Sequence, residues 1–106
     1  MISYAINVLQ IELSKVENSI CKQEKIIEKV KEKLSEADSL QSSINEFFGK
    51  LNDLSVANKL AILEVNLAKI RIYYSYDLLR HEQEKWEGLV NQRKELQNAI
   101  DFLRHD

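Results

Sequence analysis

Residues 20–34 read ICKQEKIIEKVKEKL, and the spacing of the apolar side chains in this stretch decides the fold. The apolar members of its repeat are Ile20, Ile27, Val30 and Leu34, separated by seven, three and four residues. Gln23 holds the single polar position between them. Alternating steps of three and four residues keep one stripe of a helix facing a neighbouring helix, which is the pattern of a coiled coil. The stretch therefore predicts a helix that packs along a second helix.

The same repeat extends in both directions through the first half of the chain. Its members are Ile6, Leu9, Leu13, Val16, Ile20, Gln23, Ile27, Val30, Leu34, Ala37, Gln41, Ile44, Phe48 and Leu51. A second series follows after a break, with the members Ala61, Val65, Ala68, Ile72, Ser75, Leu79, Glu82, Trp86, Leu89, Arg93, Leu96, Ile100 and Leu103. The chain has no proline and only two glycines, so little opposes continuous helix in either segment.

A cluster of turn-forming residues separates the two series. Gly49 is able to take the left-handed conformation that ends many helices, and Asn52, Asp53 and Ser55 are each able to cap the helix that follows. We therefore predict a turn at about residues 49–55.

The turn divides the chain into two arms of similar length. We predict a first helix over about 3–48 and a second helix over about 56–104, folded antiparallel as a long helical hairpin. The predicted fold is all-α, a single coiled-coil domain over residues 1–106. Serine and aspartate between residues 35 and 43 offer competing hydrogen bonds to the backbone, so a kink in the first helix stays open.

Folding at this turn places the polar positions of the two repeats near one another. Residue i pairs roughly with residue 103 minus i, which brings Gln23 close to Arg80 and Glu82. A buried polar layer lowers stability but penalises slipped registers, so these residues are candidates for fixing the register. An equally open interpretation is that this polar layer is partly solvated and does not fix the register.

The segment 60–79 is apolar on two faces. Besides the residues of the repeat, a second stripe lies about half a turn away at 100° per residue, and its members are Leu60, Leu63, Leu67, Ile70 and Tyr74. We expect the first arm to cover the repeat and the second stripe to form a protein interface, with Tyr74 as its strongest contact. A homodimer that forms a four-helix bundle is the leading expectation, and a helix of another protein or a refolded compact monomer are the alternatives. An extended, domain-swapped dimer satisfies the same repeat.

Charge gives no sign of a nucleic-acid partner. The chain has 15 basic and 17 acidic residues and a formal net charge of −2, without the basic surface of a nucleic-acid binder. In the lysine-rich stretch, glutamates alternate with the lysines at helical spacing, which is typical of a solvated helix face. The charge pattern therefore argues against nucleic acid as a partner.

The residues that carry enzyme chemistry are also absent as a set. The sequence has no set of nucleophile, base and orienting residue at the spacing of a known catalytic motif. It also has no glycine-rich phosphate-binding loop and no pair of cysteines. Asp77, His81 and Glu84 share a helix face, but a solvated cluster explains them better than a metal site. We expect no catalytic, metal or cofactor-binding residue and no enzyme activity. Cys21, the lone cysteine, fits a reducing compartment.

A membrane location is not expected either. The longest uninterrupted apolar run is the four residues 60–63, whereas a membrane-spanning helix needs about 20. The N-terminus lacks the basic start and apolar core of a secretory signal. These features favour the cytoplasm.

The aromatic and glycine residues at the turn, Phe47-Phe48-Gly49, are similar in outline to those of the small hairpin proteins handled by type VII secretion, which pair into four-helix bundles. That family has tryptophan at its turn and a Tyr-x-x-x-Asp/Glu signal in its tail. Here Tyr73 and Asp77 have that spacing in mid-helix, and Trp86 lies far from the turn, so membership is not assigned. Other helical hairpins, such as secretion chaperones and phage-encoded helper or inhibitor proteins, fit the pattern equally well.

Together these features predict a protein that acts through contact with other helices. The expected function is a non-enzymatic protein–protein interaction module, as an adaptor, chaperone, scaffold or inhibitor. Two alternatives from other classes are a nucleic-acid-binding helical dimer and a purely structural oligomerisation or spacer module.

Overall fold

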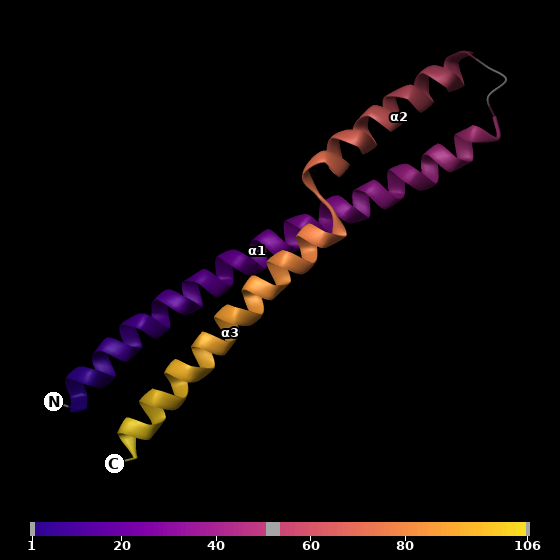
Figure 1. Ribbon diagram of the computed structural model, residues 1–106. Helices are drawn as coiled ribbons and strands as arrows, with labels where there is room; N and C mark the ends of the chain where they lie inside the picture. The colour runs from indigo at the N-terminus through magenta and orange to yellow at the C-terminus, as the bar shows by residue number, and fades with distance from the viewer. Residues whose placement is uncertain (1, 51–53, 106) are drawn as a thin grey trace. The chain divides into compact units, whose positions relative to one another are not determined.

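The computed structural model describes residues 2–50 and 54–105, and nearly all of them are helical. Three helices follow one another, α1 (Ile2–Phe48), α2 (Leu54–Tyr73) and α3 (Tyr76–Arg104) (Figure 1). No strand occurs within these two ranges. The predicted all-α class is confirmed, and the order of the elements is that of a helical hairpin whose second arm is interrupted once. Helix α1 continues without a break through residues 35–43, where the sequence left a kink open.

The contacts group the chain into two compact units. Unit 1 combines Met1–Ile27 with Arg80–Asp106, and unit 2 is the continuous segment Glu28–Leu79. Each unit is an antiparallel pair of helices, and α1 contributes one half of its length to each. The prediction of a single domain stays a prediction.

Unit 2 has a core between the second half of α1 and α2. Its buried members are Ala37, Ile44, Leu60, Leu67 and Ile70, and Leu40, Phe47, Leu63 and Tyr74 pack against them. Full burial of one leucine or isoleucine side chain contributes about 1.5–3 kcal/mol. This cluster is therefore the main source of stability for unit 2.

Unit 1 is held together by the first half of α1 and by α3. Ile20 and Ile27 are buried on α1, and Ile100 is the most deeply buried large side chain of α3. Half-buried leucines such as Leu13 and Leu96 extend the same contact. From Ile6 to Ile44, the members of the first repeat are buried or half-buried. The next member is an exception, because Phe48 is 55% exposed.

The turn between α1 and α2 differs from the prediction in one respect. The backbone N–H of Lys50 donates to the carbonyl of Phe47 at 3.0 Å, which closes a tight final turn on α1. Gly49 has no positive φ, because this bond forms with right-handed backbone angles. Ser55 lies inside α2. The predicted caps Asn52 and Asp53 lie outside the described residues, as does Leu51 of the first repeat.

The second arm is not the single helix over 56–104 that the sequence analysis predicted. It breaks at Tyr74 and Ser75, between α2 and α3. Ser75 Oγ accepts a hydrogen bond from the backbone N–H of Leu78 at 3.1 Å, so Ser75 caps the N-terminus of α3.

The phase of the apolar residues explains this interruption. The buried stripe of α2 ends at Tyr74. Leu78 and Leu79 are both half-buried at the start of α3, but the regular spacing of the α3 stripe through Glu82 and Trp86 begins at Leu79, five residues after Tyr74. One continuous helix would present these two stripes in directions that differ by nearly half a turn. Breaking the helix at Ser75 allows α2 and α3 each to turn its own stripe toward α1.

Candidate protein-interaction surface

The five residues predicted to form the protein interface lie elsewhere than expected. Leu60, Leu67 and Ile70 are only 7%, 6% and 8% exposed, because they pack on α1 in the core of unit 2. Leu63 and Tyr74 are half-buried against the same core. The prediction that this stripe is left uncovered was wrong, and whether a partner contacts any of its residues stays untested.

The opposite face of α2 is the exposed one. Its members are Ala61, Val65, Ala68 and Ile72, which we call the uncovered stripe. Val65 is 54% and Ile72 is 72% exposed, although the repeat assigned both to the seam. Side-chain size explains which face of α2 packs on α1. The stripe of Leu60, Leu67 and Ile70, with half-buried Leu63, buries more apolar area than a stripe in which two of four residues are alanine.

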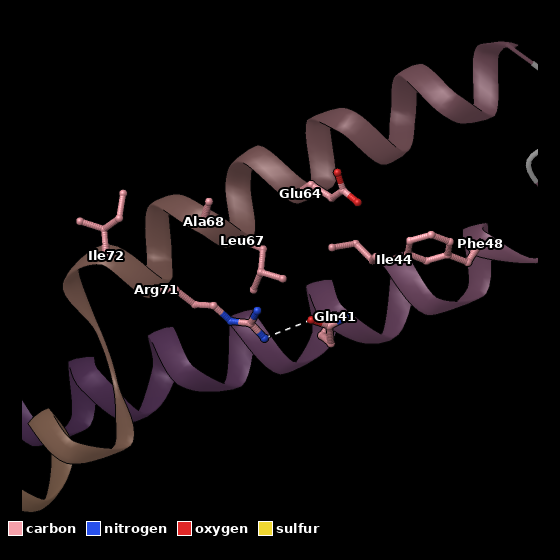
Figure 2. A pocket seen from close by; sticks show the side chains of 8 residues that line it. All are labelled: Gln41, Ile44, Phe48, Glu64, Leu67, Ala68, Arg71 and Ile72. Atoms are coloured by element: carbon pink, nitrogen blue, oxygen red, sulfur yellow. Dashed lines mark hydrogen bonds between the residues drawn. The ribbon is translucent and has the colours of Figure 1, made fainter.

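A groove runs between α1 and α2 beside the uncovered stripe. We call it the α1–α2 groove; its volume is about 520 Å³, and its lining residues are Gln41, Ile44, Phe48, Glu64, Leu67, Ala68, Arg71 and Ile72. Figure 2 shows Ile44 and Leu67 facing one another across it, with Phe48 at the end nearer the turn. Ala68 and Ile72 belong both to the groove and to the uncovered stripe, so the two form one continuous apolar surface.

A polar bridge closes the other end of the groove. Arg71 Nη2 donates to Gln41 Oε1 at 3.0 Å (Figure 2). The amide nitrogen of Gln41 in turn donates to Asn45 Oδ1 at 3.1 Å. The bridge fixes the Arg71 guanidinium beside the apolar surface. The sequence analysis did not identify Arg71, Gln41 or Phe48 as surface residues. The exposure of Phe48 could have been expected from its neighbour Phe47, because two adjacent phenylalanines compete for one buried position.

Charged and apolar residues border the uncovered stripe on its two edges. Glu64 and Arg71 are seven residues apart and share one edge, while Ile62 and Lys69 have the same spacing on the other. Within the described ranges, Glu64 and Lys69 have no hydrogen-bond or ion-pair partner. Ile62 is also exposed. The apolar stripe is thus framed by Glu64 and Lys69, which α1 leaves unpaired, and by Arg71, whose guanidinium donates to Gln41.

A second hollow of about 400 Å³ lies at the break between α2 and α3, and its lining includes Asp38, Arg71 and Tyr76. The Tyr76 hydroxyl donates to Asp38 Oδ2 at 3.0 Å. This hydrogen bond and the negative charge of Asp38 raise the pKa of Tyr76 above its ordinary value. The contact ties the first turn of α3 to α1 within unit 2.

In unit 1, the predicted neighbours Gln23 and Glu82 do meet. Gln23 Nε2 donates to Glu82 Oε2 at 2.6 Å and to the Glu82 backbone oxygen at 2.9 Å, and both residues are buried. The hydrogen bond from Gln23 lowers the pKa of Glu82, with a further contribution from Lys85 at 3.4 Å, while burial acts in the opposite direction. Nearby, the buried Nε1 of Trp86 has no hydrogen-bond partner among the described residues.

The described residues contain no group of three or more histidine, cysteine, aspartate or glutamate side chains that could hold a metal ion. None of the helices in that part of the chain is long and apolar enough to cross a membrane. The thiol of Cys21 is exposed.

Comparison with known proteins finds no matching family model, no matching curated protein and no matching solved structure.

Proposed function

We propose that this chain is a non-enzymatic protein–protein interaction module that acts by docking a helix of its partner on the uncovered stripe and the α1–α2 groove. An adaptor, a chaperone, a scaffold or an inhibitor would all use such a surface. The observation that carries the proposal is that α2 is apolar on two faces while α1 covers only one of them.

The exposed face is the kind of surface that binding proteins keep apolar. Soluble monomers rarely expose contiguous apolar patches without a function for them. Val65 and Ile72 stand one above the other along α2, and Phe48 extends the patch across the groove to α1. A helix with apolar residues at steps of three and four would bury these side chains in the way that helices bind grooves in many complexes.

Self-association belongs to the same proposal. Two copies that join through this face would bring two α1–α2 pairs together as a four-helix bundle. The lone cysteine, which cannot form an internal disulfide, is consistent with the cytoplasm as the site of action.

The test compares two variants that add the same charge one residue apart. Val65→Glu places a carboxylate in the centre of the uncovered stripe, whereas Asn66→Glu places it about 100° away on an exposed polar position. Wild type and both variants would be purified, checked for helix content by circular dichroism, and assayed for self-association and for affinity capture from an extract of the source organism. We expect Val65→Glu to lose its partners and Asn66→Glu to keep them.

Two results would contradict the proposal. One is capture and self-association by Val65→Glu at wild-type levels. The other is a wild-type chain that associates with nothing, itself included.

A further inference from the structure

We propose that the uncovered stripe is covered by a second copy of this chain, with the two α2 helices antiparallel about a two-fold axis that passes between Val65 and Ala68. The inference rests on the proposed function, because it names the partner of the same surface. It follows from the order of large and small residues along the stripe and from the charges on its edges.

The stripe is complementary to itself in size when it is inverted. A two-fold interface brings the same surface together with its own inverted copy. Inversion about the midpoint between Val65 and Ala68 sets Val65 against Ala68 of the second copy and Ala61 against Ile72 of the second copy. Each large side chain then faces a small one, which fills space evenly. A parallel arrangement instead sets alanine against alanine and leaves gaps.

The charges on one edge match in the same arrangement. In an antiparallel helix pair, residues on one edge face residues on the same edge of the partner helix. Glu64 therefore faces Arg71 of the second copy, and symmetry forms this pair twice. The bridge to Gln41 already holds the Arg71 guanidinium in place, which reduces the side-chain entropy that a new ion pair would lose.

The other edge also avoids a conflict. There Lys69 lies beside Ile62 of the second copy, so its aliphatic stem covers an exposed apolar side chain while its ammonium group stays in water. Like charges do not oppose one another on either edge. Slipping the register by one heptad would bring Glu64 against Glu64, so the charges select the register that the side-chain sizes favour.

The expected dimer is modest in affinity. Helix α2 has 20 residues and is about 30 Å long at 1.5 Å per residue, so the contact lies at the small end of specific interfaces. The measurement is therefore sedimentation equilibrium over a concentration series from roughly 1 μM to 1 mM. We expect reversible dimerisation of the wild-type chain.

Charge reversal tests the register. Glu64→Arg sets arginine against Arg71 in both symmetric contacts, and we expect it to weaken the dimer roughly tenfold or more. Arg71→Glu should do the same. An equimolar mixture of the two variants should form a heterodimer near the wild-type affinity, because every facing pair is then opposite in charge.

Lys69→Glu distinguishes the two orientations, and Asn66→Glu, an exposed position off the stripe, is the matched control for added charge. In the antiparallel register Lys69 packs beside an isoleucine and forms no ion pair, so its reversal should weaken the dimer clearly less than Glu64→Arg does. In a parallel dimer Glu64 would face Lys69, and this variant would then weaken the dimer as much as Glu64→Arg. That result, or a mixture of Glu64→Arg and Arg71→Glu that fails to associate, would overturn the proposed arrangement.

The oligomeric state of the wild-type chain tests self-pairing separately from the docking function on which the inference rests. A chain that stays monomeric up to 1 mM, but captures another protein in a manner that Val65→Glu abolishes, overturns self-pairing and leaves the docking function standing. A monomer that captures nothing overturns both.

Discussion

In a Gln23→Leu variant, Glu82 would stay buried in unit 1 but lose both hydrogen bonds from the Gln23 amide, at 2.6 Å to its carboxylate and at 2.9 Å to its backbone oxygen. A hydrogen bond to a charged group contributes about 1.5–3 kcal/mol, and one to a neutral oxygen about 0.5–1.5 kcal/mol. The new leucine recovers about 1–2 kcal/mol by burial. We expect a net loss of about 1–3 kcal/mol in the free energy of unfolding, which lowers Tm by roughly 5–15 °C for a chain of this length.

The pH dependence of this loss has a definite sign. In the native protein the pKa of Glu82 lies below its ordinary value of 4.5, chiefly because Gln23 donates to the ionised form. The ionised carboxylate therefore contributes stability above about pH 4.5, and this contribution is lost as pH falls through the lower native pKa. In Gln23→Leu the main cause of the lowering is gone while burial remains, so the pKa of Glu82 rises. The difference in stability between wild type and variant should be largest near neutral pH and shrink below about pH 4.

The assay is urea unfolding followed by circular dichroism at several pH values, with Gln97→Leu as a control because Gln97 is exposed on α3. The double variant Gln23→Leu, Glu82→Leu should recover the loss, since both polar groups are then replaced by apolar side chains. A single Gln23→Leu variant more stable than wild type at neutral pH would refute the reasoning, and so would a loss that does not depend on pH.

Three further predictions concern the break and the joining of the two units. Ser75→Ala should lower stability by about 1 kcal/mol through loss of the N-cap of α3, whereas Ser42→Ala on an exposed position of α1 should not, as measured by urea unfolding. Asp38→Asn should lower the pKa of Tyr76 toward its ordinary value of 10.0, measured by ultraviolet absorbance titration, and an unchanged titration curve would contradict the contact. Because α1 runs unbroken through both units, fluorescence of Trp86, the only tryptophan, and circular dichroism should report the same unfolding midpoint. Separate midpoints would contradict the single-domain prediction.

The first arm was predictable because its sequence offers one apolar stripe. Along α1, most residues between the buried positions are charged or polar, and exposed apolar side chains such as Val8, Ile11 and Ile26 are scattered singly, so only one face has a continuous apolar stripe to pack on a neighbour. The contact of Gln23 with Glu82 was predictable for the same reason, since a fixed repeat on both helices fixes which residues lie opposite.

The second arm was harder to predict because α2 offers two apolar stripes. The second repeat correctly predicts the buried face of α3, which includes Glu82 and Ile100. Extended backwards into α2, the same repeat marks the face that is exposed. The sequence did contain the missing signal: the stripe that begins at Leu60 ends at Tyr74, and the next begins out of phase at Leu79. A change of phase of that size cannot be absorbed by a straight helix, so it indicates a break as well as a change of face.

The division into two units has a consequence for how the chain folds. Unit 2 is one continuous segment, Glu28–Leu79, and joins neighbouring helices across a short turn, whereas unit 1 unites the two ends of the chain. Contacts between residues close in sequence require less loop closure and form faster. We therefore expect the hairpin of unit 2 to form first and α3 to close onto the first half of α1 afterwards. A truncation at either terminus would then remove part of unit 1 and leave the earlier-folding hairpin, with its uncovered stripe, complete.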